Sequence, residues 1–265
     1  MNTLRLWQIT DTHCYEDDQL ALEWSALPVY PNLSLQRVLA HFQQQLGEAS
    51  QAAEALIISG DLAQAETLAT YQRLNQLLHV LPIPTYALPG NHDQPHLMQQ
   101  GLNGRVSCPS IVQFDQWFIL LLDTSKPNHS DGHLSAEQLA NLQQQLAQLP
   151  ADAYAIIFMH HQPELINSAW MDVMGLQQKA AFWQTLAPFP QVKAVFHGHI
   201  HHEYYTVHRF ANGRCIPIYG TPATSIQLQA NHPVFALASD QPAWRTIELK
   251  SDGSLITLVN YLSKL

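Results

Sequence analysis

Seven residues of types that bind metal ions lie in five short motifs, in a fixed order along the chain. The candidate ligands are Asp11, His13, Asp61, Asn91, His160, His199 and His201. Their oxygen atoms and imidazole nitrogens suit divalent and trivalent ions, and the set is large enough for two ions. A two-metal site of this kind makes hydroxide from water and clamps a phosphate ester. The motifs therefore predict metal-dependent hydrolysis of a phosphate ester.

The five motifs differ in how specific they are. An Asp-x-His pattern such as that of Asp11 and His13 occurs often by chance, and Asp61 after a glycine is equally typical of a turn. As a ligand, Asp61 is expected to bridge the two ions. The string Pro-Gly-Asn-His-Asp at residues 89–93 is uncommon enough to favour function over a plain turn. Only the ordered set of five carries the prediction.

Three consecutive residues, Asn91, His92 and Asp93, are given separate roles. Asn91 offers an amide oxygen to the second ion. His92 is expected to contact the phosphate and to protonate the leaving oxygen. Asp93 is expected to accept a hydrogen bond from His92 and so raise its basicity. His92 and Asp93 are therefore the predicted catalytic residues, and Asn91, His161 and His201 join His92 in the predicted substrate-binding set.

The remaining candidate histidines follow two apolar runs. His160 ends the run 155–159 and is expected to point toward the motif edge. Strand alternation predicts that His161 points the other way, as a residue that supports the ligands or faces the substrate. His199 and His201 flank Ile200 and share one side, so either each serves one ion or both serve the same ion. The other histidines among the fifteen are interpreted as core or surface residues.

Apolar runs typical of strands precede all five motifs and must position them. The strands expected before motifs are 4–10, 55–59, 85–88, 153–159 and 192–196, with a further strand at 117–122. Apolar residues at helical spacing predict helices within 35–46, 68–78 and 179–186, and a capping box at 135–138 starts another.

The tail after about residue 203 has a different pattern. Strands are expected at 204–210, 214–219, 244–249 and 255–261, and Asn-Gly and Asp-Gly pairs mark hairpin turns. Two sheets packed face to face with helices outside is the simplest arrangement. We expect one domain over residues 1–265, with a motif-bearing β/α part at about 1–202 and an antiparallel part at about 203–265.

Composition and sequence pattern argue against several partners and locations. The formal charge is −9 and no basic stripe is present, which argues against a polymeric nucleic acid as partner. The three cysteines lie far apart, so no disulfide framework is expected. The first residues read as a strand and not as a signal peptide, and no apolar run is long enough for a membrane helix. The predicted location is the cytoplasm.

The ordered motifs resemble the calcineurin-like metallophosphoesterase superfamily, with its D-x-H, GD, GNH, H and GHxH pattern. Residues 60–64, 88–93 and 198–201 and parts of the tail (Thr221, Pro222, Ser225, Gln227 and 242–245) look like bacterial class III 3′,5′-cyclic-AMP phosphodiesterases. The resemblance implies a four-layer αββα sandwich of two mixed β-sheets flanked by helices. It also implies two metal ions, iron and manganese with zinc as an option.

The resemblance further implies a ligand set for each ion and a reaction. Asp11, His13, Asp61 and His201 would hold the first ion, and Asp61, Asn91, His160 and His199 the second. A hydroxide bridging the ions would attack phosphorus in 3′,5′-cyclic AMP and release 5′-AMP. Cys14 departs from the apolar residue expected there: it is either a small packed side chain or a thiol that makes the site sensitive to oxidation.

Two other functions and two candidate substrate walls stay open. A broader phosphodiesterase could use the same site on glycerophosphodiesters or 2′,3′-cyclic nucleotides. A non-catalytic interaction scaffold of the same fold is disfavoured, because no ligand position is missing. Trp170 and Met171 could stack on a purine, form a homodimer contact or belong to a local core. The segment 14–33 is the other candidate wall.

Overall fold

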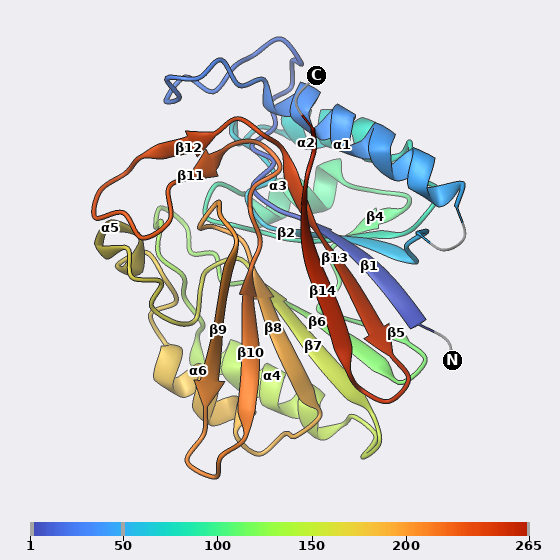
Figure 1. Cartoon of the computed structure of the whole chain (residues 1–265), viewed down its shortest axis with the longest axis vertical. Helices are drawn as coiled ribbons and strands as arrows, with labels where there is room; N and C mark the ends of the chain where they lie inside the picture. Colours follow the sequence, from blue (N-terminus) through green and yellow to red (C-terminus); the bar gives the residue numbers. More distant parts are fainter. Residues whose placement is uncertain (1–2, 49–50, 264–265) are drawn as a thin grey trace.

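Two six-stranded sheets form the centre of the computed structural model, which describes residues 3–48 and 51–263 (Figure 1). The first sheet has the order β14 (Leu255–Tyr261), β13 (Ala243–Lys250), β1 (Thr3–Ile9), β2 (Ala55–Ser59), β3 (Thr85–Leu88) and β4 (Val106–Ser107). The second has the order β5 (Ile111–Phe114), β6 (Trp117–Leu122), β7 (Tyr154–Met159), β8 (Val192–His197), β10 (Cys215–Gly220) and β9 (Tyr204–Arg209). Both sheets are mixed: β1–β4 and β6–β8 with β10 run parallel, and hairpin strands add antiparallel pairs.

Alternation along the strands sends apolar side chains to both faces of each sheet. In β1 and β2, Leu6 and Ile57 join a cluster between the two sheets, together with Phe158 and Phe196 of the second sheet. Their neighbour Leu56 faces the opposite way, into a second cluster against helices. Each central strand is therefore buried on both faces, which explains its continuous apolar run.

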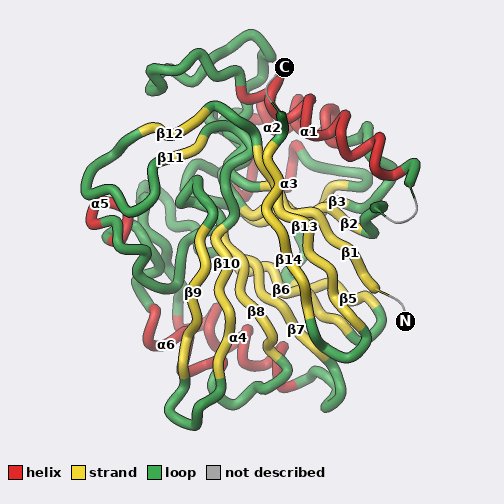
Figure 2. The backbone as a smooth tube through the Cα atoms, in the orientation of Figure 1, coloured by secondary structure: helices red, strands yellow, loops and turns green. Residues whose placement is uncertain are grey.

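Helices cover the outer face of each sheet (Figure 2). α1 (Pro31–Leu46) and α2 (Leu68–Leu78) pack on the first sheet, and α4 (Ala136–Ala147) and α6 (Lys179–Leu186) on the second. The apolar stripe of α1 is buried through Leu35, Val38, Leu39 and Phe42. The predicted capping box at Ser135 and Gln138 is present at the start of α4. The prediction of two mixed sheets flanked by helices is confirmed.

The structure contains most of the predicted helices and strands. It also contains several short elements that were not predicted. The Asn-Gly and Asp-Gly turns join β9 to β10 and β13 to β14 as predicted. α1 begins at Pro31, earlier than the apolar stripe indicated, because proline fits the first helical turn. The sequence did not predict α3 (Pro95–Gly101), α5 (Ala169–Asp172), β4, β5, β11 (Gln227–Leu228) or β12 (Leu237–Ser239). These elements are too short for a periodic signal.

The carboxyl ends of the parallel strands of both sheets bring the motifs together. Asp11 and Asp61 follow β1 and β2, and Asn91 follows β3. His160 follows β7 and His199 follows β8 in the other sheet. In open α/β sheets, ligands bind outside this edge.

In the part of the chain that the structure describes, no helix is both long and apolar enough to cross a membrane.

Asp18 anchors the irregular segment between β1 and α1. Its carboxylate accepts hydrogen bonds from Arg73 Nε at 2.9 Å, from Asn32 and from Gln36, and so ties the segment to α1 and α2. The Arg73 hydrogen bond is the main reason that the pKa of Asp18 is lowered from 3.8 to about 2.

We expect Asp18→Asn to lower the free energy of unfolding by about 1 kcal/mol at neutral pH, as for a partly exposed ion pair. Because the pKa is lower in the folded chain, this contribution is present above pH 4 and is lost as pH falls from about 4 to about 2. Urea unfolding at pH 6 and at pH 3 measures it. Asp17→Asn, at a neighbouring exposed position, is the control; an equal loss in both variants would contradict the assignment.

Candidate metal centre

Backbone strain is concentrated at the predicted ligands. Among the described residues, nine non-glycine residues have positive φ, and five of them are Asp11, His13, Asp61, His199 and His201. The left-handed region costs free energy for residues with a Cβ atom, and such strain is typical of functional sites. The backbone of the loops after β1, β2 and β8 is therefore strained at the residues that carry the candidate ligand atoms.

Asp11, His13 and His201 form one of three compact groups, with ligand atoms within 4.8 Å of one another. His201 Nε2 lies 3.1 Å from Asp11 Oδ1. Two bonds orient this group: His201 Nδ1 lies 2.8 Å from the Ile226 carbonyl oxygen, and Ser225 donates to the Asp11 carbonyl oxygen at 2.6 Å. A hydrogen bond on one ring nitrogen fixes the other as a ligand, which is the usual arrangement of a metal-binding histidine.

Asp61 lies between this group and His160. Its Oδ2 atom is 3.8 Å from His13 Nε2 and 3.3 Å from His160 Nε2. Its other oxygen accepts a hydrogen bond from the His92 backbone N–H at 2.9 Å. A second compact group joins Asp61 and His160 to Asp11. One carboxylate oxygen thus faces ligands of both predicted ions, as a bridging ligand requires.

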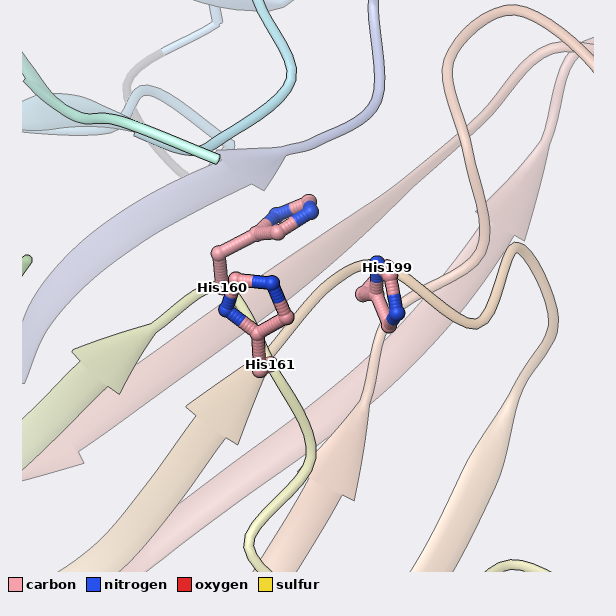
Figure 3. Close-up of side chains that lie close together, drawn as sticks. All are labelled: His160, His161 and His199. Carbon is pink, nitrogen blue, oxygen red and sulfur yellow. The ribbon is translucent and has the colours of Figure 1, made fainter. Parts of the chain in front are cut away.

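His161 does not follow the predicted alternation. Its ring gathers with those of His160 and His199 in the third compact group, with ring centroids 4.7–5.0 Å apart (Figure 3). β7 ends at Met159, so the alternation of strand side chains no longer applies at His161. His161 Nδ1 lies 2.8 Å from Thr124 Oγ1, which leaves Nε2 toward the site. The sequence signals for this group were the two adjacent histidines after a strand end and the motif that contains His199.

The donor atoms of the candidate centre fit metal ions. Asn91 Oδ1, His161 Nε2 and His199 Nε2 are buried without a hydrogen-bond partner, and Asp11 Oδ1 and His160 Nε2 are buried with only another candidate ligand nearby. A buried polar atom without a partner costs about 1–3 kcal/mol, and native proteins rarely leave several together. Metal coordination would satisfy all of them. Carboxylate, amide and imidazole donors are also the set that iron, manganese and zinc accept.

The pKa values of the buried histidines are shifted in different directions. Desolvation lowers the pKa of His13 to about 3 and holds the pKa values of His161 and His199 well below the usual range. For His160, desolvation is outweighed by the Asp61 and Asp11 carboxylates, which raise the pKa to about 9. His13 and His199 are therefore neutral at pH 7, the form that binds a metal, whereas His160 must lose a proton when an ion binds.

Asp93 has a different role from the predicted one. Within the described chain, its carboxylate accepts hydrogen bonds from the backbone N–H groups of Leu62, Ala63 and Gly90 and from the Tyr71 hydroxyl, and not from His92. The side chain turns into the protein because these donors converge there. Desolvation and the nearby Asp61 raise its pKa to about 6, against the lowering effect of the backbone donors. Asp93 thus ties the loop after β2 to the loop after β3.

His92 and Asn91 border a cavity of about 460 Å³. The opposite wall is the loop 123–130, with Ser125, Lys126 and His129. The His92 ring also packs edge-on against His13, with centroids 5.1 Å apart. This volume is within the range of small-molecule sites, so a substrate can reach His92 and Asn91 from this side.

The structure also places the residues of the two candidate substrate walls and Cys14. Met171 is buried in a local cluster with Ile166 and Ile200, and Trp170 packs against it, so the local-core alternative is confirmed for Met171. Cys14 is fully buried, and desolvation raises its pKa to about 12, which fits the small packed side chain and not a reactive thiol. In the segment 14–33, the Trp24 ring lies 6.2 Å from the His13 ring, a neighbour that the sequence did not identify.

Gly90 has no space for a side chain, because a Cβ atom there would overlap Asp61. We expect Gly90→Ala to displace Asp61 and lower phosphodiester hydrolysis about 100-fold, as misplacement by about 1 Å can. Turnover and bound metal measured on the same preparation test this. Gly47→Ala is the control, since a Cβ atom there meets only a carbonyl oxygen at 3.2 Å. Wild-type activity in Gly90→Ala would contradict the tight fit.

Curated relatives match nearly the whole chain. It is 32% identical over 264 residues to 3′,5′-cyclic adenosine monophosphate phosphodiesterase CpdA of Vibrio vulnificus, covering 99% of this chain and 91% of the relative. It is 34% identical to CpdA of Haemophilus influenzae, covering 98% and 91%, and 34% identical to CpdA of Escherichia coli K12, covering 98% and 90%.

A solved structure and a family model agree with the observed fold. A dimetal phosphatase from Danio rerio superimposes with a TM-score of 0.63 at 13% identity, covering 98% of this chain and 99% of the other. Residues 4–203 match the family model of the calcineurin-like phosphoesterases. That match contains every candidate ligand, and the chain belongs to the calcineurin-like phosphoesterase family.

Proposed function

We propose that this protein is a metal-dependent phosphodiesterase that hydrolyses 3′,5′-cyclic AMP to 5′-AMP. The observation that carries the proposal is the convergence of buried ligand atoms from five loops of both sheets at one edge, several of them without a hydrogen-bond partner. The choice of cyclic AMP as substrate rests on relatives that are named as cyclic-AMP phosphodiesterases and are similar over nearly the full chain. The scaffold alternative has no support, because a non-catalytic chain has no reason to keep this donor set.

The proposed ligands divide into two sets that share Asp61. Asp11, His13 and His201 would hold the first ion with Asp61, and Asn91, His160 and His199 the second. Such ions supply a nucleophile from water at neutral pH and neutralise charge on the phosphate. Iron and manganese, with zinc as an option, are the proposed metals. His161 would act at the second set, where its ring lies with those of His160 and His199.

His92 is the proposed general acid. It borders the cavity and lies beside His13, so its ring is placed to give a proton to the ribose 3′-oxygen as the bond to phosphorus breaks. Asn91 and His201 would contact the phosphate from the ligand side. Asp93 acts only by positioning, because it fixes the backbone directly after Asp61 and directly before Asn91.

The proposal extends to the organisation of the chain. We treat residues 1–265 as one domain, because apolar side chains of both sheets share one cluster and both sheets supply ligands. The proposed location is the cytoplasm, where cyclic AMP is available. A homodimer is the proposed assembly state, and analytical ultracentrifugation measures it directly.

Product analysis tests the function. Protein supplied with manganese is given 3′,5′-cyclic AMP, 2′,3′-cyclic AMP, a glycerophosphodiester and bis-p-nitrophenyl phosphate in parallel. We expect 5′-AMP from the first substrate at the lowest concentration. Cleavage of the other esters without 5′-AMP formation would replace this proposal with the broader phosphodiesterase.

A further inference from the structure

We propose that Trp24 and Phe235 form a stacking wall for the adenine base, an inference that rests on the proposed cyclic-nucleotide activity. Three aromatic rings lead away from the candidate centre in a row. Trp24 lies 6.2 Å from His13, Phe235 lies 5.9 Å from Trp24, and Trp170 lies 5.6 Å from Phe235, all as ring centroids. The row begins at a proposed metal ligand and ends on the local core beneath Trp170.

The row is assembled from three segments that are distant in the sequence. Trp24 belongs to the segment between β1 and α1, Phe235 to the connection between β11 and β12, and Trp170 to α5. Figure 1 shows these segments on one side of the molecule, near the carboxyl ends of the central strands. Trp24 is also held by a hydrogen bond from its indole N–H to Gln64, in the loop that follows Asp61.

Trp24 and Phe235 are more exposed to solvent than Trp170, which packs against Phe235. Trp24 and Phe235 are 38% and 48% exposed, whereas Trp170 packs on the cluster of Ile166 and Met171. Exposed apolar side chains that contact one another, as Trp24 and Phe235 do, are typical of interaction and ligand sites. Base stacking needs only the face of an aromatic ring and contributes strongly to nucleotide binding.

The charges near Trp24 and Phe235 indicate which part of a nucleotide these rings would contact. The segments 14–33, 166–174 and 229–236 contain no lysine or arginine, so the surface offers nothing to hold a second phosphate. A neutral planar ring fits it better. The cavity beside His92 is different, since it is lined by Lys126, Ser125 and acidic side chains and suits the hydroxyl groups of the ribose. The proposal places the phosphate at the candidate ligands and the ribose between the phosphate and the base at Trp24, whose ring lies 6.2 Å from that of His13.

Comparison of 5′-AMP with ribose 5-phosphate isolates the contribution of the base. Their dissociation constants would be measured by calorimetry on manganese-loaded protein for wild type, Trp24→Ala, Phe235→Ala and Trp24→Phe. Tyr205→Ala is the control, because Tyr205 is an exposed aromatic residue on β9 outside the row. The ratio of the two constants cancels any effect on phosphate binding.

We expect wild type and Tyr205→Ala to bind 5′-AMP at least about tenfold more tightly than ribose 5-phosphate, and Trp24→Ala to lose most of this preference. Phe235→Ala should lose part of it, and Trp24→Phe should retain most. kcat/KM for cyclic AMP should fall about tenfold in Trp24→Ala.

Two results would overturn the stacking wall. One is an unchanged ratio in both alanine variants, which would place the base elsewhere, with the cavity beside His92 as the alternative. The other is equal weakening of both ligands in Trp24→Ala without recovery in Trp24→Phe, which would make Trp24 structural. If wild type does not cleave cyclic AMP, the proposed function is wrong. The ratio of the two dissociation constants still shows whether Trp24 and Phe235 bind the base.

Discussion

Asp61→Asn will abolish phosphodiester hydrolysis while leaving the fold intact. The substitution keeps an oxygen for the His92 backbone N–H and removes the charge that faces both His13 and His160. Without a bridging carboxylate, the two ions cannot be held as a pair. We expect turnover to fall by about three orders of magnitude or more, because the paired ions supply several kcal/mol of transition-state stabilisation.

The matched control is Asp115→Asn. Asp115 also has a left-handed backbone, with φ of 48° against 51° for Asp61, but it lies in the turn between β5 and β6. Metal content by elemental analysis, circular dichroism and turnover would be compared for both variants. Asp115→Asn should match wild type in all three. Bound metal and turnover near the wild-type values in Asp61→Asn would remove Asp61 from the centre.

His92→Ala will lower turnover far more than it lowers metal content. His92 reaches the centre through its backbone bond to Asp61, which alanine keeps, while its ring borders the cavity. Loss of a general acid costs about 10²–10⁴-fold in rate. We expect two ions per chain in the variant and a fall in kcat within this range.

A change of leaving group separates acid catalysis from other effects. p-Nitrophenolate leaves without a proton, so bis-p-nitrophenyl phosphate should lose much less rate than cyclic AMP in His92→Ala. His96→Ala, an exposed histidine on α3, is the control and should behave as wild type. Equal losses of metal and turnover, or equal losses on both substrates, would count against His92 as the acid.

The sequence predicted the parts of the fold that carry a long apolar run or a marked turn. Strands such as β2 and β6 have the predicted bounds because both of their faces are buried. The prediction failed where a contact from elsewhere in the chain decides the conformation. β11 and β12, two and three residues long, pair with one another and carry no periodic signal of their own.

The candidate site was predictable in composition but not in detail. The ordered motifs contain every residue of the three compact groups except His161, because strand ends place consecutive motifs at one edge. Most partners of Asp93 could not be predicted, since two of its three backbone donors lie in the loop after β2, about thirty residues away. The direction of His161 depended on where β7 ends, and the position of Trp24 depended on how Asp18 anchors an irregular segment.

Metal titration tests the central claim most directly. Protein stripped by a chelator is titrated with manganese, and 5′-AMP formation from 3′,5′-cyclic AMP is followed against the molar ratio of metal to chain. The proposed centre predicts no activity without metal and a maximum at two ions per chain. Full activity in the stripped protein, or a maximum at one ion, would contradict a catalytic pair bridged by Asp61.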